Sequence, residues 1–216
     1  MNSEQLLHQD IDRYLTDLIP ARPPVIQRME QYGRERNFPF IGPLVGEMLF
    51  LLTRAINARR VLELGSGFGF SAMHFALAMP ADGKIICTDG DAENKKMAIQ
   101  FFKEAGISEK LEYHVGDAVS IMEKLEGEFD IILMDIDKEG YPEGFRKGWP
   151  RLRKGGFFIA DNLLWDGRVI KDDDSASTRG VREFTKLIYG TAGAKTTIIP
   201  LRDGVSVTMK LAGATH

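Results

Sequence analysis

The sequence predicts one α/β domain built on a mostly parallel β-sheet. Three observations support this prediction. Short apolar runs alternate with amphipathic stretches from Leu62 to Leu211, the runs are uniformly apolar, and 216 residues suit one domain with one substantial core. Uniformly apolar strands are typical of sheets that helices cover on both faces. We therefore expect a single domain over residues 1–216, with N-terminal helices in 1–57 and the sheet core in 58–211.

Apolar residues at helical spacing predict three helices ahead of the sheet. They are expected at Ile11–Ile19, Val25–Arg36 and Pro43–Asn57. Proline-rich residues 20–24 and the polar stretch 37–42 separate them.

Five apolar runs then predict five parallel strands, joined by helices as in βα units. The strands are expected at Arg60–Leu64, Lys84–Thr88, Leu111–Val115, Phe129–Met134 and Gly156–Ala160. The helices between and after them are expected at Phe70–Met79, Ala92–Ala105, Val119–Leu125 and Gly144–Leu152.

The last third of the chain has a different pattern. A helix is expected at Thr178–Tyr189, followed by β-rich runs at Thr196–Leu201 and Val205–Leu211. Because an Asp-Gly pair, Asp203 and Gly204, lies between the two runs, they predict an antiparallel hairpin that completes a seven-stranded sheet. Lys171–Ser177, with three consecutive aspartates, is expected to be an exposed, mobile loop.

Composition excludes several classes of protein. A net charge of −3 argues against broad nucleic-acid binding, which generally needs a basic face. No apolar run approaches the ~20 residues of a membrane-spanning helix, and the N-terminus does not resemble a secretion signal. We therefore expect a soluble, cytoplasmic protein. The only cysteine, Cys87, rules out an internal disulfide and a metal site built from cysteines.

A glycine-rich turn at Gly65–Gly69 follows the first predicted strand and opens a helix. Its glycines allow the backbone to approach a ligand closely at the carboxyl edge of the sheet. A dinucleotide fingerprint needs glycine in the sixth position, where this chain has Phe70. Glu63, just before the turn, suits a cationic amino-acid ligand better than a phosphate.

The next two strand ends also carry ligand-like residues. Asp89 closes the second apolar run about 20 residues after the glycines, where a carboxylate commonly accepts ribose hydroxyls, and Asp91 is an alternative. Gly116-Asp117-Ala118 follows the third run, in position to meet an adenine edge. Taken singly, each could be a turn or a helix cap. Together they favour a nucleoside-containing cofactor.

The fourth and fifth strand ends predict a metal site. Asp135 follows one strand, and Asp161 and Asn162 follow its expected neighbour. Oxygen ligands without histidine or cysteine select a hard cation, Mg²⁺ first, with Mn²⁺ or Ca²⁺ as alternatives. Simple helix capping by the aspartates is the competing interpretation. Lys138, three residues beyond Asp135, is a candidate general base, unless it is an ordinary solvated lysine.

These residues resemble the cation-dependent O-methyltransferases, the family of catechol O-methyltransferase and the plant caffeoyl-CoA O-methyltransferases. The resemblance runs from about Tyr14 to Leu211 and is most specific at 135–141, 161–169 and 203–205. Trp165-Asp166-Gly167 is closer to the caffeoyl-CoA and bacterial branch, and Ile136 replaces the histidine of the catechol branch.

The resemblance implies a Rossmann-like class I methyltransferase fold, S-adenosylmethionine as methyl donor, and a divalent metal. It implies metal ligation by Asp135, Asp161 and Asn162, with Lys138 as the catalytic base. The cofactor contacts it implies are Ile41, Glu63, Gly65, Ser66, Gly67, Ser71, Asp89, Asp117, Ala118 and Asp135. Ser71 would hold the methionine carboxylate at a helix N-terminus, where anions bind favourably.

The chain also departs from the family pattern. Gly90 stands where relatives usually carry an apolar residue beside the adenine. Val45 and Glu47 lie at a helix start that often reads Glu/Lys-Gly-Gln. We therefore expect a looser hold on the adenine and a different N-terminal edge of the pocket.

The implied reaction is metal-dependent methyl transfer to one hydroxyl of a small, catechol-like vicinal diol. A lid that excludes water is expected, formed by Trp165, Arg168 and residues 172–177. Lys138, Trp165 and Arg182 are the expected substrate contacts, with Arg182 meeting an anionic group, although packing for Trp165 and a helix-surface position for Arg182 are alternatives. Relatives are often dimers, so we expect a homodimer formed through the N-terminal helices.

Three other functions remain open at this point. The same chemistry could methylate a hydroxylated uridine in transfer RNA, with basic residues as footing. These are Arg34 and Arg36 in one cluster, and Arg151, Arg153 and Lys154 in another. A nucleotide-binding oxidoreductase is less favoured, because Phe70 stands in place of the sixth glycine and the oxygen-ligand triad is present. A catalytically inactive binding module is less favoured, because the metal ligands and Lys138 are all present.

Overall fold

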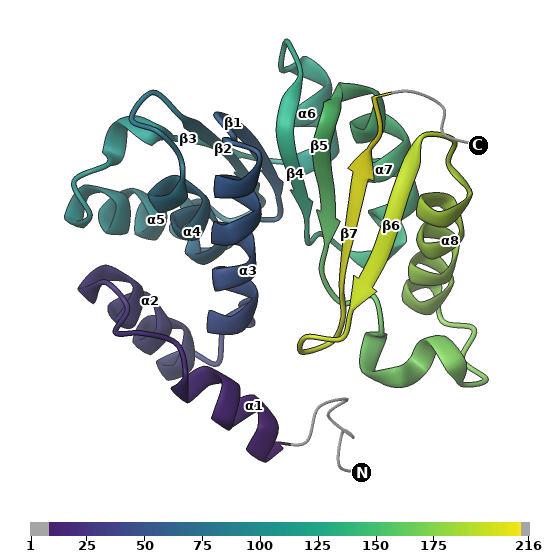
Figure 1. Cartoon of the computed structure of the whole chain (residues 1–216), viewed down its shortest axis with the longest axis horizontal. Coiled ribbons are helices and arrows are strands. Elements are labelled where there is room, and N and C mark those ends of the chain that lie inside the picture. The colour runs from purple at the N-terminus through teal and green to yellow at the C-terminus, as the bar shows by residue number, and fades with distance from the viewer. Residues whose placement is uncertain (1–8, 213–216) are drawn as a thin grey trace.

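The protein is described by a computed structural model that covers residues 9–212 (Figure 1). Within these residues the sheet has seven strands in the order β3-β2-β1-β4-β5-β7-β6. Strands β1 to β5 pair in parallel, whereas β7 is antiparallel to both β5 and β6. Their bounds are β1 Arg60–Leu64, β2 Lys84–Asp89, β3 Leu111–Val115, β4 Phe129–Met134, β5 Leu152–Ala160, β6 Ala194–Ile199 and β7 Val205–Lys210. The predicted mixed sheet with a C-terminal antiparallel hairpin is confirmed.

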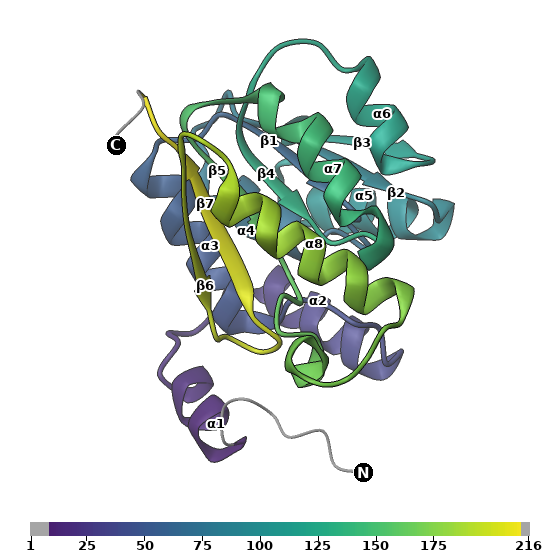
Figure 2. The ribbon, with the colours of Figure 1, turned by 90° about the vertical axis from the view of Figure 1, so that its right-hand side faces the viewer.

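Helices cover both faces of the sheet (Figures 1 and 2). The α-helices are α1 Gln9–Asp17, α2 Pro24–Glu35, α3 Gly42–Ala55, α4 Phe70–Ala78, α5 Ala92–Glu104, α6 Ala118–Lys124, α7 Tyr141–Gly148 and α8 Ala176–Gly190. Short 3₁₀ turns are η1 Ser108–Lys110, η2 Lys138–Gly140, η3 Trp149–Arg151 and η4 Trp165–Ile170. No helix in the described part of the chain is long and apolar enough to cross a membrane.

Two hydrophobic cores lie on opposite faces of the sheet, because successive strand residues point to opposite sides. Val61 packs with residues of α2 to α5, whereas its neighbour Leu62 packs with residues of α6, α7 and α8. Ile131 and Ile132 divide between the two cores in the same way. Uniformly apolar strands are therefore needed here, as the sequence pattern indicated.

The segment between β4 and β5 differs from its prediction. The expected helix Gly144–Leu152 begins earlier, at Tyr141, and ends at Gly148. Pro142 lies in its first turn, where a missing N–H is tolerated. Strand β5 then begins at Leu152 instead of Gly156, and the β4–β5 register shifts between Phe129 and Ile131. The polar residues that open β5 concealed this extension.

Candidate functional site

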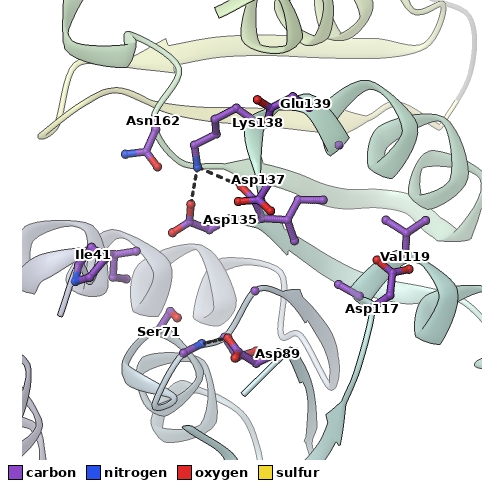
Figure 3. A pocket seen from close by; sticks show the side chains of 18 of the residues that line it. Ile41, Ser71, Asp89, Asp117, Val119, Asp135, Asp137, Lys138, Glu139 and Asn162 are labelled. Atoms are coloured by element: carbon purple, nitrogen blue, oxygen red, sulfur yellow. Dashed lines mark hydrogen bonds and ion pairs between the residues drawn. The ribbon is translucent and has the colours of Figure 1, made fainter. Parts of the chain in front are cut away.

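A pocket of about 1010 Å³ lies at the carboxyl ends of the parallel strands (Figure 3). Ligands of open α/β sheets generally bind at this edge. The predicted site residues that line it are Ile41, Gly65, Ser66, Gly67, Ser71, Asp89, Asp117, Ala118, Asp135, Lys138, Asn162 and Trp165. Glu63, Asp161 and Arg182 are not among its lining residues.

The glycine turn between β1 and α4 forms one end of the pocket. Gly65, Gly67 and Gly69 all have positive φ values, of 86°, 51° and 85°, which favour glycine. A Cβ on Gly65 would overlap the backbone carbonyl of Asp135, so β1 and β4 approach each other closely here. The turn brings the N-terminus of α4, with its unpaired N–H groups, to the pocket.

Asp89 ties the ends of β1 and β2 together. Its carboxylate accepts hydrogen bonds from the backbone N–H of Gly67 at 2.9 Å and from the Asn94 side chain at 3.0 Å. Asp91, the alternative, instead caps α5 by accepting the backbone N–H of Glu93 at 2.8 Å. Asp117 caps α6 in the same manner and still lines the pocket. Asp89 therefore lines the pocket and remains the candidate cofactor contact, whereas Asp91 is a helix cap outside the lining.

Glu63 is buried beneath the glycine turn. Burial raises the pKa of its carboxyl from 4.5 to about 8, although hydrogen bonds from Ser71 and Ser66 oppose the shift. The Ser71 hydroxyl donates directly to this carboxyl group. A cationic ligand group at the turn would stabilise the ionised carboxylate, so Glu63 suits a positively charged ligand.

Lys138 lies at the other end of the pocket and is only 7% exposed. Its Nζ donates to Asp135 Oδ1 at 2.8 Å, to the Tyr141 hydroxyl at 2.8 Å and to the Ile136 carbonyl at 3.2 Å. The Tyr141 hydroxyl in turn donates to the Asp161 carbonyl at 3.0 Å. In Figure 3, Lys138 lies between Asp135 and Asn162. The buried amine is thus fixed between two strand ends.

Asp161 and Asn162 follow β5, next to Asp135 at the end of β4. Asp161 Oδ1 is buried and has no hydrogen-bond partner among the described residues. Burial and the neighbouring Asp135 carboxylate raise the pKa of Asp161 above its usual range, although Arg202 opposes the shift. Asn162 has φ of 60° and lines the pocket. A bound cation would satisfy the unpaired oxygen and reduce the repulsion between the two aspartates.

The predicted metal ligands therefore fit a hard cation, although they do not form a purely acidic site. No group of three histidine, cysteine, aspartate or glutamate side chains with metal-binding geometry occurs within residues 9–212. The set depends on the amide oxygen of Asn162 together with two carboxylates. Oxygen-only sets of this kind, completed by water or substrate oxygens, suit Mg²⁺.

Trp165 and Ser177 line the pocket, and the segment between them lies outside its lining. The Trp165 indole nitrogen is buried without a hydrogen-bond partner in the described structure. The expected mobile loop is anchored through Asp173, whose carboxylate accepts hydrogen bonds from Arg168 at 2.5 Å and Thr178 at 2.8 Å. Arg182 donates to the carbonyls of residues 168, 169, 171 and 173. The Arg182 guanidinium therefore holds this segment, and the structure does not bring it to the pocket.

Sequence reasoning missed the roles of Tyr141 and Asp203. Tyr141 stood within a conspicuous stretch, but its partners are Lys138 and backbone carbonyls, which leave no pattern in the sequence. Asp203 accepts the backbone N–H of Asp166 at 2.7 Å, which fixes the segment after Trp165 to the β6–β7 turn. In the sequence, Asp203 and Gly204 indicated a turn and a part of the family resemblance, but not this contact with Asp166.

Comparisons with known proteins agree with this geometry. A family model described as O-methyltransferase matches residues 28–211. Caffeoyl-CoA O-methyltransferase 1 of Eucalyptus globulus is 29% identical over 210 residues, which cover 91% of this chain and 85% of the relative. Caffeoyl-CoA O-methyltransferase of Pinus taeda is 30% identical over 75% of this chain and 68% of its own length.

Solved structures show the same fold. The O-methyltransferase TomG from Streptomyces achromogenes, involved in tomaymycin synthesis and solved in complex with SAM, has a TM-score of 0.87 and 28% identity, with 97% of this chain and 99% of that chain covered. A methyltransferase from Geobacter sulfurreducens has a TM-score of 0.82 and 29% identity, with coverage of 96% and 100%. The family model spans most of the sheet core and the strand ends that build the pocket. The chain belongs to the O-methyltransferase family and is a methyltransferase enzyme.

Proposed function

We propose that this enzyme transfers the methyl group of S-adenosylmethionine to one hydroxyl of a small, catechol-like vicinal diol, with a divalent cation held by Asp135, Asp161 and Asn162. One observation carries the proposal. The buried Lys138 amine and the unpaired Asp161 oxygen flank Asp135, whose backbone adjoins the glycine turn, so the candidate cation ligands lie next to the cofactor end of the pocket.

The turn end of the pocket suits S-adenosylmethionine. The buried Glu63 and the N-terminus of α4 complement an ammonium and a carboxylate respectively, the two charged groups of the methionyl part. Asp89 and Asp117 then lie along the pocket, in position for the ribose and the adenine. The bound SAM of the Streptomyces relative supports this assignment.

The Lys138 end suits the acceptor. S-adenosylmethionine supplies a sulfonium whose methyl carbon is open to attack by oxygen. As the O–C bond forms, the S–C bond breaks, the sulfonium becomes a neutral thioether, and the hydroxyl proton passes to Lys138 Nζ, which accepts it in its neutral amine form. Lys138 is positioned for this by Asp135 and Tyr141, which fix its amine at 2.8 Å. Alignment of this kind can contribute on the order of 7 to 11 kcal/mol to lowering a barrier.

Asp135, Asp161 and Asn162 are the residues that would hold the divalent cation, with Mg²⁺ as our first choice. When bound, the cation supplies Lewis acidity and a template for two neighbouring oxygens, which is why a vicinal diol is the proposed acceptor. Trp165 lines the pocket, where its ring and its unpaired indole N–H can cover an aromatic acceptor.

Arg34, Arg151 and Arg153, from the two basic clusters, are engaged in contacts within the protein, which argues against these clusters as a footing for transfer RNA. Arg151 donates to the carbonyls of Gly127 and Met122, and Arg153 is paired with Asp130. Arg151 lies just before β5 and Arg153 lies at its start, so both are at the end of the strand opposite the pocket. Arg34 pairs with the buried Glu30 carboxylate. These contacts favour a small acceptor.

The test is transfer of a labelled methyl group from S-adenosylmethionine to caffeate, to catechol and to bulk unmethylated transfer RNA. Each acceptor is assayed with Mg²⁺ and with EDTA, using the native enzyme and the Asp161→Asn variant. We expect label on a diol only with Mg²⁺, and a large loss in the variant. Label on RNA alone, or equal transfer in EDTA, would contradict the proposal.

A further inference from the structure

Arg202 lies at the acceptor end of the site, on the turn between β6 and β7. Its Nη1 is 3.6 Å from Asp161 Oδ2, and its side chain is 35% exposed. A Cβ placed on Gly42 would lie 3.4 Å from Arg202 Cδ, so the side chain also runs past the start of α3. Gly42 and Asp161 adjoin the lining residues Ile41 and Asn162. Arg202 is not itself a lining residue, but these neighbours place its side chain directly behind the wall of the pocket at Ile41 and Asn162.

The Arg202 guanidinium retains its hydrogen-bonding capacity. At 3.6 Å its contact with Asp161 is an ion pair without a hydrogen bond. Within residues 9–212 the guanidinium donates no hydrogen bond to any other residue. A guanidinium has five N–H donors in a rigid fork. The chain thus keeps an unused set of donors beside its reactive centre.

The other cations around the pocket are committed to partners. Arg168 is bonded to Asp173 and Ser175, and Arg182 to four backbone carbonyls. Lys147, which also lines the pocket, is paired with Glu123 and Glu143. Lys138 is held by Asp135 and Tyr141. Among these described cations, Arg202 is the one whose donors are available to a ligand.

The strength of the contact between Arg202 and Asp161 depends on whether a cation is bound at Asp161. That carboxylate already has one oxygen without a hydrogen-bond partner and lies beside Asp135. A divalent cation at Asp161 would repel the guanidinium and weaken its attraction to the carboxylate. Arg202 would then be left to bind whatever negative charge the acceptor carries.

We propose that Arg202 is a specificity-determining residue that selects an anionic acceptor, a vicinal diol on an aromatic ring that bears a carboxylate. This inference rests on the proposed function and adds the charge of the substrate. With the two hydroxyls next to Lys138 and Asn162, the carboxylate extends from the ring toward the β6–β7 turn. Arginine binds carboxylates through two parallel hydrogen bonds, which lysine cannot reproduce.

The test compares 3,4-dihydroxybenzoate with its neutral methyl ester. Each is titrated calorimetrically into the enzyme with Mg²⁺ and S-adenosylhomocysteine, so that binding is measured without turnover. In Arg202→Gln, the dissociation constant of the acid is expected to rise about tenfold or more, and that of the ester by less than about twofold. Arg202→Lys keeps the charge and is expected to recover part of the loss.

Arg59→Gln is the matched control, because Arg59 is a surface arginine paired with Asp82 at the opposite edge of the sheet. It is expected to bind both ligands as the native enzyme does. Equal weakening of acid and ester in Arg202→Gln, unchanged binding of the acid, or binding of neither ligand to the native enzyme would overturn the inference. If binding depends on Arg202 but no methyl is transferred to either ligand, the proposed function fails and the inference stands.

Discussion

At the scale of single residues, Glu63 makes stability depend on pH. Its carboxyl pKa is about 8 in the folded protein against 4.5 for an ordinary glutamate. Between these values the folded state binds more protons than the unfolded state, so raising the pH favours unfolding. In the ligand-free protein we expect the free energy of unfolding to fall by up to about 1.4 kcal/mol per pH unit between pH 5 and 8, as urea unfolding would measure.

The Glu63→Gln variant provides the control for this prediction. Glutamine is neutral at every pH and preserves the shape of the side chain, so its stability curve should be flatter over the same range. Asp161 also has a raised pKa and contributes to both curves, so the difference between the curves isolates Glu63. Parallel curves would show that Glu63 is already ionised in the folded protein.

Tyr141 positions Lys138 through a single hydroxyl group. Tyr141→Phe removes the 2.8 Å contact with the lysine and the 3.0 Å bond to the Asp161 carbonyl, while the ring stays packed against Phe184. We expect kcat to fall about tenfold while KM for the acceptor and Kd for the cofactor change less than threefold, because alignment is lost and binding is not.

Tyr113→Phe should give the opposite result. The Tyr113 hydroxyl donates to the Gly67 carbonyl at 2.6 Å, in the turn at the other end of the pocket. Its loss is expected to weaken cofactor binding and leave kcat almost unchanged. Identical effects in the two variants would indicate general loosening and would argue against a positioning role for Tyr141.

At the scale of elements, helix α8 supports the segment that carries Lys138. Gly180 lies so close to η2 that an added Cβ would sit 2.8 Å from the Lys138 carbonyl carbon and 3.0 Å from Glu139 Cα. Since those are backbone atoms, Gly180→Ala must separate the helix from the segment. We expect a loss of about 1 to 3 kcal/mol in stability and a reduced kcat, measured by denaturant unfolding and methyl transfer.

Gly190, at the end of the same helix, is the matched control. A Cβ there would meet no atom within 4 Å. Gly190→Ala should therefore leave activity unchanged and raise stability by up to about 1 kcal/mol, through lower entropy of the unfolded chain. Equal behaviour of the two variants would contradict the close approach of α8 to η2.

At the scale of the whole molecule, α1 and the residue that follows it leave apolar side chains in solvent. Ile11, Tyr14 and Leu18 are 49%, 63% and 61% exposed. If the expected homodimer forms through the N-terminal helices, charges on this face should separate the subunits.

Light scattering is expected to give a dimer mass for the native protein and a monomer mass for the Tyr14→Glu, Leu18→Glu double variant. Ile99→Glu, at a residue of α5 that is 46% exposed, should remain a dimer, and a native monomer would refute the expectation.

The sequence could predict the sheet because its strands are apolar on both faces, and it could predict the glycine turn because φ values such as that of Gly65 favour glycine. It could not assign Arg182, because the partners of that side chain are backbone carbonyls of a folded segment. The same holds for Tyr141, which bonds to the carbonyl of Asp161. Backbone partners exist only in the fold and are invisible in the amino-acid pattern.

The strand order divides the site between two parts of the chain. The ends of β1, β2 and β3 carry the turn, Asp89 and Asp117, whereas the ends of β4 and β5 and the β6–β7 turn carry Lys138, Asp161 and Arg202. Under the proposed function, donor recognition and acceptor recognition can therefore diverge separately during evolution. Exchanging residues 160–204 between relatives would transplant a preference for an acceptor while most donor contacts stay as they are.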